Sequence, residues 1–403
     1  MCLNPLSTIL NSSPHGYKLN KDYKINHLFY MDDVKLYASN ADQMRHLLEL
    51  TLEFSNDICM KFGLEKCNTL NIKGGKLADP SNVTLSDNIT IKSLDENEQY
   101  KYLGLKQQLS INDSELKKEY ETSFLKRLHM ILNTELNAKN KIRAINSWVI
   151  PLLSYTYGIL KWSQTDLETL DRLTRTTMTK HRVHHPRACV ERLYVPRRNG
   201  GRGLLNIQKL HNAQVIKMKN YFNISDNPMH EILKNNNFDY LALKQDHEER
   251  FSNNNECVNQ AVDTWKKKTL HGKYPQLLDE PKIHKENSIT YLRKGELYPE
   301  TEGFITAIQD SVIATKNHQK FIFKTITDDK CRLCKEKSET IEHVIGSCKI
   351  LANTEYLNRH NQVAKIIYSK LIIQNKIKDY VEPYYKLNPE PVLENDQFKI
   401  LWD

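Results

Sequence analysis

The sequence predicts an α+β fold, with short strands near the N-terminus and helices over most of the remaining chain. Two runs rich in aromatic and β-branched residues flank an Asp pair within residues 25–38, which is the pattern of a hairpin. Apolar residues then recur at spacings of three and four from Met44 to Ile58, as in an amphipathic helix. The chain has 403 residues, a length that favours two or three domains.

The first helix is expected over residues 41–62, with Asn40 capping its start and Gly63 its end. Short strands should follow at residues 67–72, 83–91 and 100–109. Later patterns predict helices over 112–182, a basic turn region at 183–203 and a helix to about 225. Mixed helix and loop should follow over 226–300, and helix over 301–330. After a Cys cluster at 331–348, we expect one amphipathic helix at 359–373 and then an extended region interrupted by prolines.

Positive charge is concentrated in one part of the chain. Residues 111–210 hold 18 Lys and Arg against 9 Asp and Glu, which accounts for the whole formal net charge of +9. A basic segment flanked by neutral ones indicates a surface for a phosphate backbone, and the alternative is an ordinary solvated helical face.

The first residues lack the basic segment and cleavage site of a signal peptide, so the eight Cys predict a reducing, intracellular setting, nuclear or cytoplasmic, rather than a disulfide framework. The longest apolar stretch, residues 148–160, is too short to span a membrane, so no membrane partner is expected.

Asp32 and Asp33 fall where the predicted hairpin turns. Two neighbouring carboxylates repel each other unless a cation joins them, and Mg²⁺ prefers such hard oxygen ligands. Phosphoryl transfer by two metal ions needs carboxylates of this kind. The alternative is an acidic β-turn, where Asp is common in any case.

Three motifs in order resemble reverse transcriptases. FYMDDVKLYA resembles the catalytic YxDD hairpin, which implies Mg²⁺ on Asp32 and Asp33, with Tyr30 and Met31 beside the nucleotide and primer end. FGLEKCNTL resembles the next family motif and implies that Lys66 lies near the triphosphate, although a solvated strand-edge Lys is an equal alternative. YKYLGL resembles the primer-grip hairpin, within which Gly104 is expected to serve packing or a bulge.

The family also needs a third carboxylate, a fingers domain and a template-side helix, which are not found before the Asp pair. The resemblance therefore implies half of the palm's ferredoxin-like sheet. Its open strand edge is expected to be covered, to need a partner chain or to cause aggregation. We expect no polymerase activity from this chain alone, because metal binding and nucleotide positioning would be incomplete.

Residues 331–348 have the spacing C-x2-C-x8-H-x4-C, which predicts a closed, structural Zn²⁺ site of Cys331, Cys334, His343 and Cys348. The x4 spacing should bring His343 and Cys348 to one side of a helical turn. The segment resembles the CCHC knuckle downstream of the polymerase in non-LTR retrotransposons that carry a restriction-like endonuclease. Its basic residues could touch nucleic acid or only solvate the knuckle; they are Arg332, Lys335, Lys337 and Lys349.

Arg197, Arg198 and Arg202 lie among glycines in a segment similar to the linker of these elements, where glycine lets backbone approach phosphate and arginine binds it. The alternative is a basic turn. A second metal site at His181, His184, His185 and Cys189 is a further, weaker alternative. The basic residues expected on the thumb helices include Lys117, Lys118, Lys126, Arg127, Lys141 and Arg143.

The resemblance covers nearly the whole chain. It implies a partial palm at 1–110, a helical thumb at 111–182 and a basic, mostly helical linker at 183–330. The zinc knuckle follows at 331–349, and residues 350–403 would form a helix and the start of a truncated endonuclease-like region. It implies an RNA-directed DNA polymerase fragment whose partners are an RNA template, a DNA primer or target, and dNTP if active. The alternative is a non-catalytic nucleic-acid-binding protein that uses the basic thumb, linker and knuckle. A zinc-dependent protein-interaction module is the third possibility.

Overall fold

A computed structural model describes residues 3–21, 23–61, 63–78, 80–86, 88–235 and 254–402. Within these ranges the chain combines helices with small β-sheets, which confirms the α+β class. Part of the expected mixed segment, residues 236–253, lies outside the described ranges, as does Phe62 of the second motif.

The chain divides into two compact units that each gather segments distant in the sequence. Unit 1 comprises Met1–Thr134, Ile142–Thr177 and Leu204–Cys257. Unit 2 comprises Glu135–Lys141, Met178–Gly203 and Val258–Asp403. This division therefore does not follow the consecutive segments expected from the sequence.

The Asp pair lies on the predicted hairpin. Strand β3 (His27–Tyr30) pairs antiparallel with β4 (Asp33–Leu36), and Tyr30 lies opposite Asp33. Met31 and Asp32 therefore form a two-residue turn. This part of the expected order is confirmed, and the short loop places both Asp side chains at the tip of the hairpin.

Helix α2 (Ala41–Asp57) follows the hairpin, and the Asn40 side chain accepts a hydrogen bond from the N–H of Gln43, as its N-cap role predicts. The helix ends five residues earlier than expected. Cys59 takes a left-handed φ of 57°, whereas Gly63 has a φ of −78°, so the expectation that Gly63 ends the helix is wrong.

The strands form five two-stranded sheets and one three-stranded sheet within the described ranges. In the three-stranded sheet β9 (Thr90–Ser93) is central, parallel to β5 (Asn68–Thr69) and antiparallel to β8 (Val83–Thr84). The other antiparallel pairs are β1 (Tyr17–Lys18) with β2 (Lys24–Ile25), β6 (Ile72–Lys73) with β7 (Lys76–Leu77), β10 (Tyr100–Tyr102) with β11 (Leu105–Gln107), and β12 (Val392–Glu394) with β13 (Lys399–Leu401).

Helix α2 supports the hairpin and the three-stranded sheet through two apolar clusters. Towards the hairpin and α1 (Asn4–Ser12) the cluster consists of Leu6, Leu10, Leu47 and Phe54, with Phe29 and Leu36 packed against it. Towards the sheet it consists of Leu52, Val83, Leu85 and Ile91. Each fully buried aliphatic side chain contributes about 1.5–3 kcal/mol, so these clusters hold the Asp-bearing hairpin on a packed base.

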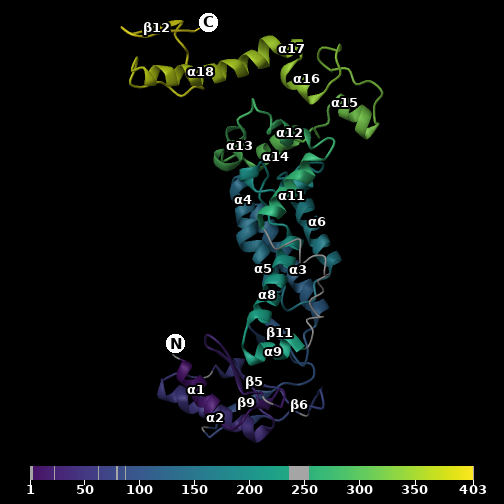
Figure 1. The fold of residues 1–403 in the computed structure, drawn as a ribbon, viewed down its shortest axis with the longest axis vertical. Coiled ribbons are helices and arrows are strands. Elements are labelled where there is room, and N and C mark those ends of the chain that lie inside the picture. The colour runs from purple at the N-terminus through teal and green to yellow at the C-terminus, as the bar shows by residue number, and fades with distance from the viewer. Residues whose placement is uncertain are drawn as a thin grey trace. The chain divides into compact units, whose positions relative to one another are not determined.

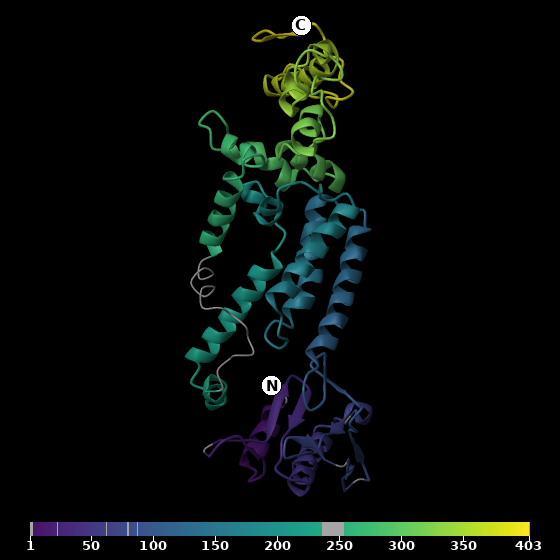
Figure 2. The ribbon, with the colours of Figure 1, turned by 90° about the vertical axis from the view of Figure 1, so that its right-hand side faces the viewer.

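Helices dominate the rest of unit 1, as predicted for residues 112–182. Helix α3 (Asp113–Leu132) packs beside η2 (Ile145–Val149) and α5 (Ile150–Ser154), and α5 packs on α8 (Ile207–Ile224). The blue α3 and the teal α8 can be followed in Figures 1 and 2. η2 is a π-helical turn just before Pro151, which has no backbone N–H to donate to the regular hydrogen-bond ladder. The remaining elements that begin in this part of the sequence are η1 (Leu64–Lys66), α4 (Ala138–Ala144), α6 (Gln164–Lys180) and α9 (Pro228–Asn235).

Most elements of unit 2 are helices, and the longest of them has 18 residues. They are α7 (Val190–Tyr194), η3 (Arg197–Asn199), α11 (Asn254–Lys266), α12 (Lys273–Leu277), α13 (Lys285–Lys294), α14 (Pro299–Gln309), α15 (Lys316–His318), η4 (Gln319–Phe323), α16 (Ile341–Gly346), α17 (Lys349–Leu351), η5 (Ala352–Tyr356) and α18 (Leu357–Gln374). The amphipathic helix predicted in the tail is confirmed as α18, and Tyr368 and Ile372 pack it against Leu393 of the β12–β13 hairpin. None of the described helices combines the length and apolar character needed to cross a bilayer.

Burial of His211 predicts that unit 1 loses stability at acid pH. His211 on α8 is 5% exposed, and its ring meets that of Tyr157 edge to face. Desolvation lowers the pKa of His211 below its usual value of 6.5. The unfolded chain then takes up a proton at a higher pH than the folded chain, so the free energy of unfolding falls as the pH drops below 6.5.

We expect His211→Gln to flatten this pH dependence by at most about 1.4 kcal/mol per pH unit, the slope for one proton. Protection factors of the α8 amides in hydrogen exchange, measured between pH 7.5 and pH 5.5, would show it. The exposed His129, changed to Gln, is the control. Equal pH dependence in both variants would contradict this account of His211.

Candidate functional site

Three cysteines and one histidine near the C-terminus meet in space. Ligand atoms of Cys331, Cys334, His343 and Cys348 all lie within 4.8 Å of one another. Cys331 and Cys348 are each 1% exposed, so two of the four groups are shielded from solvent. Among the residues that the structure describes, this is the only group of three or more such side chains placed to hold a metal ion. The convergence expected from the spacing is confirmed.

Local backbone structure brings these four side chains together. The N–H of Cys331 donates to the carbonyl of Lys337, and the N–H of Lys335 donates to the carbonyl of Cys331, both at 2.8 Å, which closes a tight turn around the first two cysteines. The Thr340 hydroxyl caps α16 by accepting from the N–H of His343 at 3.0 Å. Both arrangements depend only on nearby residues, which is why the spacing was informative.

The fourth ligand is held differently from the expectation. α16 ends at Gly346, so Cys348 does not share a helical turn with His343. Instead, the N–H of Cys348 donates to the hydroxyl oxygen of Tyr356 at 3.1 Å, and that hydroxyl donates to the carbonyl of Val344 at 2.8 Å. The phenol of Tyr356 therefore joins the end of α16 to the cysteine after it.

The distances fit a tetrahedral ion. Metal–sulfur and metal–nitrogen bonds of about 2.3 and 2.0 Å place two sulfurs roughly 3.8 Å apart, and a sulfur and a nitrogen roughly 3.5 Å apart. The sulfurs of Cys331 and Cys348 are 4.0 Å apart, and the sulfur of Cys334 lies 3.4 Å from Nε2 of His343. This cluster could hold a metal ion with little movement of its side chains.

Hydrogen bonds from the backbone N–H groups of Lys337 and Glu336 lower the pKa of the Cys334 thiol to about 6. The thiolate is the form that binds metal. Burial instead raises the pKa of Cys331. A positively charged ion would favour the thiolate at both positions, because an opposite charge stabilises the ionised form.

Of the four basic residues around the cluster, two form ion pairs and two do not. Arg332 binds Glu339 with two donors, at 2.9 and 2.7 Å, and Lys349 binds Glu336. Burial opposes the ionisation of Glu339, yet the Arg332 hydrogen bonds and backbone N–H groups lower its pKa to about 2. Lys335 and Lys337 are exposed and have no carboxylate within ion-pair distance in the described part of the chain. These two ammonium groups are free to meet an anionic partner.

The Asp pair is a separate candidate. Asp32 and Asp33 are both exposed at the tip of the β3–β4 hairpin. Tyr30 and Met31 beside them are 55% and 80% exposed. Met31 has a φ of 56°, a left-handed conformation that is uncommon for residues other than glycine. The turn therefore holds its carboxylates outward, at some backbone strain.

Lys35 connects this hairpin to the next one. Its Nζ donates to the hydroxyl oxygen of Tyr100 at 2.7 Å and lies 3.5 Å from Oε1 of Gln107. The ring centres of Tyr37, Tyr100 and Tyr102 lie 5.9, 5.1 and 4.9 Å from the same ammonium group. Because a cation is attracted to aromatic faces, these contacts dock β3–β4 on the β10–β11 hairpin.

Sequence reasoning missed Lys35. Asp33, Lys35 and Tyr37 alternate along the chain, which places their side chains on one face of a strand and was the available signal. Burial, together with the neighbouring phenols, raises the pKa of Tyr37 to about 12. Burial and the charge of Asp33 raise the pKa of Tyr102. Both hydroxyls therefore stay protonated at neutral pH.

Lys66 and Gly104 have other settings than expected. Lys66 is exposed at the end of η1, a short 3₁₀ turn, and not on a strand edge. Leu103 and Gly104 form the turn of the β10–β11 hairpin with φ values of 46° and 81°. Two successive positive φ values are those of a type I′ turn. A Cβ on Gly104 would meet only the Tyr155 ring, at 3.9 Å, so the residue serves the turn rather than packing or a bulge.

The basic residues expected on the thumb helices divide into two sets. Lys118, Lys126 and Arg143 are exposed. The others are engaged within the protein: Lys117 pairs with Asp166 at 2.9 Å, Arg127 lies 5.0 Å from the centre of the Trp148 ring, and Lys141 is 5% exposed. The exposed set is the part of the predicted surface that a phosphate backbone could reach.

The arginines of the linker segment are mostly internal. Arg197 binds both carboxylate oxygens of Glu302, at 2.7 and 2.9 Å. Arg202 is 1% exposed and donates from Nε to Glu302 at 2.9 Å. The expectation that all three arginines bind phosphate is therefore corrected, because only Arg198 is exposed. A Cβ on Gly201 would lie 2.0 Å from the carbonyl oxygen of Val195, so this glycine permits backbone to pack on backbone.

Arg192, which sequence reasoning did not single out, is buried in the interior of unit 2. It is 1% exposed, and its guanidinium lies 5.0 and 4.7 Å from the ring centres of Trp265 and Tyr274. Nη1 donates to Asp310 at 2.9 Å, and Nε donates to the carbonyl of Gly200 at 3.2 Å. No local signal distinguishes Arg192 from exposed arginines, because its partners are remote in sequence.

The alternative metal site in the same region does not assemble. His181, His184, His185 and Cys189 form no metal-ligating group within the described ranges. Burial raises the pKa of the Cys189 thiol to about 12, and this thiol donates to Glu191 at 3.2 Å. Cys189 is thus a packed, protonated side chain.

Glu302 neutralises two arginines from a position that is 1% exposed. We expect Glu302→Gln to destabilise unit 2 by about 3–5 kcal/mol, because it leaves buried guanidinium charge uncompensated. Urea denaturation measures this loss. Glu280→Gln, at an exposed position in the same unit, makes the same charge change and should cost less than about 0.5 kcal/mol. Equal stability of the two variants would show that Arg202 finds another counter-charge.

The two candidate sites rest on the contacts and distances of their own side chains. Comparison with protein-family models gave no match, and comparison with curated proteins gave none either.

Proposed function

We propose that the chain is part of the reverse transcriptase of a non-LTR retrotransposon, and that it binds nucleic acid and contributes two carboxylates to a two-metal site. The observation that carries the proposal is the exposed Asp32–Asp33 pair at the tip of a hairpin that Lys35 docks on a second hairpin. The order of motifs supports it: a YMDD turn, a helix, a Lys-bearing turn and then the YKYLGL hairpin.

In this proposal β3, β4, α2 and the three-stranded sheet belong to the palm. Asp32 and Asp33 would hold Mg²⁺, which stabilises charge on the transferred phosphoryl group. Their outward placement fits that donor role, since exposed carboxylates on a tight turn tolerate each other best with a cation between them. Lys66, exposed on η1, would face the triphosphate.

The proposal keeps the expectation that this chain alone does not polymerise DNA. Within the described ranges, Asp32 and Asp33 belong to no cluster of three or more potential metal ligands. Two metal ions need more carboxylates than two to be held firmly, so a further carboxylate would have to come from elsewhere. A partner chain that completes the palm is consistent with this need.

We further propose that the four-ligand cluster holds a structural Zn²⁺. Three thiolates and one imidazole form a complete tetrahedral set, which leaves no open position for a substrate. Nε2 of His343 would be the ligand atom, because it is the ring nitrogen that faces Cys334.

A second candidate, nucleic-acid binding without catalysis, is favoured by the exposed cations. In unit 1 the predicted cations that are exposed are Lys118 and Lys126 on α3 and Arg143 on α4. In unit 2 they are Arg198, Lys335 and Lys337. Such groups bind the phosphate backbone and need no metal. RNA template and DNA primer are the proposed partners in both cases.

Binding to an RNA–DNA primer–template should weaken steeply as salt increases. We expect Lys118→Ala combined with Lys126→Ala to reduce the slope of log K against log salt by about 2, one unit for each lost phosphate contact. Fluorescence anisotropy across a salt series measures it. Lys370→Ala combined with Lys386→Ala, both exposed positions, removes the same charge and should leave the slope unchanged. No measurable binding to the primer–template at low salt would instead favour a zinc-dependent protein-interaction module.

The same samples test catalysis. With Mg²⁺, dNTPs and a primer–template, we expect no incorporation by the chain alone. Incorporation that Asp32→Ala abolishes would show that the proposed two-metal site is complete in this chain, contrary to the expectation.

Removal of one zinc ligand should abolish metal binding. We expect Cys348→Ser to bind less than one Zn²⁺ per chain and to lose the absorption bands of tetrahedral Co²⁺, because three ligands no longer close the site. Cys59→Ser, at an exposed cysteine, is the matched control and should bind one ion. Equal metal content in both variants would exclude Cys348 as a ligand.

A further inference from the structure

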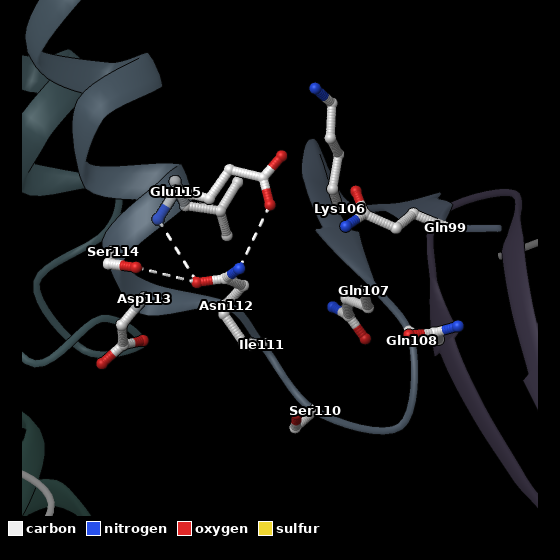
Figure 3. Close-up of a pocket in the computed structure, with 11 residues that line it drawn as sticks. Gln99, Lys106, Gln107, Gln108, Ser110, Ile111, Asn112, Asp113, Ser114 and Glu115 are labelled. Atoms are coloured by element: carbon white, nitrogen blue, oxygen red, sulfur yellow. Dashed lines mark hydrogen bonds between the residues drawn. The ribbon is translucent and has the colours of Figure 1, made fainter. Parts of the chain in front are cut away.

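A polar pocket lies between the β10–β11 hairpin and the start of α3, in unit 1 (Figure 3). Its volume is about 560 Å³, within the range of sites for small organic ligands. Four side-chain amides line it, together with two carboxylates; they are Gln99, Gln107, Gln108, Asn112, Asp113 and Glu115. None of these residues is one of the proposed metal ligands.

Tyr100 and Lys35 fix the orientation of the Gln107 side chain. Its Oε1 accepts from the hydroxyl of Tyr100 at 3.0 Å and faces the ammonium group of Lys35 at 3.5 Å. Because an ammonium group can only donate, the amide oxygen must be the atom on that side. The NH₂ group of Gln107 therefore points away from Lys35, and nothing in the described structure accepts from it. The pocket wall thus presents two unused donors.

Gln108 complements this arrangement. Its Nε2 donates to the backbone carbonyls of Asp95 and Glu96, which leaves its Oε1 as an acceptor. Asn112 is used inside the pocket wall, where it hydrogen-bonds the first turn of α3 at Ser114 and Glu115 (Figure 3). A free donor on Gln107 and a free acceptor on Gln108 in the same lining suit a ligand that carries both kinds of group.

The charges of the pocket disfavour an anion. Asp113 and Glu115 contribute two carboxylates, and the one ammonium group in the lining, that of Lys106, binds Glu119 at 3.0 Å. A phosphate group would be repelled, whereas a neutral ring with N–H and carbonyl groups would not. Ile111 and Leu116 also line the pocket and offer apolar contact for the face of such a ring.

The residues around the pocket indicate which kind of molecule would carry this ring. The pocket lies where the basic segment 111–210 begins, and α3 carries the exposed Lys118 and Lys126. Lys118 lies only two positions after Leu116, which lines the pocket, so a phosphate bound at Lys118 would be close to it. Unpaired bases in single strands are recognised by hydrogen bonds to their edges.

We propose that this pocket receives an unpaired nucleobase of a bound nucleic-acid strand, with the amide of Gln107 donating to its carbonyl or ring nitrogen. The proposal rests on the nucleic-acid-binding function proposed above. It adds a base-reading site whose proposed donor, Gln107, is distinct from the phosphate-binding cations. Lys35 acts here as a positioning residue, since it fixes the amide and does not touch the base.

Two ligand sets separate the possible sources of the base. Free adenosine, guanosine, cytidine and uridine are titrated by saturation-transfer NMR, and single-stranded RNA is compared with an abasic oligonucleotide of equal length and charge. The chain should bind at least one nucleoside and should prefer the base-bearing strand roughly tenfold, as expected for one recognised base.

Gln107→Glu keeps the oxygen that faces Lys35 and replaces the two donors with a negatively charged oxygen. We expect it to weaken nucleoside binding roughly tenfold or more and to remove the preference for bases. Asn97→Asp makes the same charge change on a nearby exposed turn that does not line the pocket, and it should leave both properties unchanged. If Gln107→Glu does not fold, Ser110→Trp, at an exposed lining position, tests the pocket by filling it.

The outcomes are distinct. Salt-dependent RNA binding without nucleoside binding or base preference would overturn the pocket and leave the proposed function standing. Nucleoside binding that depends on Gln107, in a chain that binds no RNA, would support the pocket for free nucleosides and refute the proposed function. Equal effects of Gln107→Glu and Asn97→Asp would mean that net charge, and not the fixed amide, controls binding, and would also overturn the inference.

Discussion

The ammonium group of Lys35 lies between two hairpins without a carboxylate partner in the described part of the chain. It is held by a phenol oxygen, an amide oxygen and three aromatic rings. Cation–π contacts of this kind contribute about 0.5–2 kcal/mol each, with the larger values in desolvated settings. Removing Lys35 would weaken the contact of the Asp-bearing hairpin with β10–β11 and would leave the Gln107 amide oxygen with Tyr100 as its only partner in the described part of the chain. Both proposed sites of unit 1 therefore depend on one side chain, although neither includes it among its ligands.

Unit 2 is notable for burying several charged side chains. Arg192 and Arg202 are each 1% exposed and are matched by Asp310 and Glu302. Buried ion pairs gain little net stability over apolar packing, but losing one partner is costly, so the set acts as a whole. A count of basic residues along the chain therefore overstates the positive surface. Some of the excess charge between residues 111 and 210 is neutralised by acids that lie beyond residue 300.

Features set by neighbouring residues were predictable from the sequence. The hairpin, the N-cap of α2 and the convergence of Cys331, Cys334, His343 and Cys348 each follow from spacing over a few residues. Features set by distant partners were not. Arg202 is 100 positions from Glu302, and Lys35 is 65 positions from Tyr100. A local pattern carries no information about such partners, so the same arginine pattern fits a phosphate surface and a buried network equally well. Even the end of α2 escaped prediction, since the left-handed residue just after the helix is Cys59 and not Gly63, which was expected to cap it.

The four-ligand cluster has a consequence for the lifetime of the folded C-terminal region. Cys331 and Cys348 are 17 positions apart, and their sulfurs lie 4.0 Å from each other. An ion bound there would close this loop as a disulfide does, and would restrict the unfolded chain in the same way. Unlike a disulfide, such a link forms in a reducing compartment and opens when the ion is withdrawn. Exposure of this region to proteases would then follow the supply of zinc rather than the redox state of its surroundings.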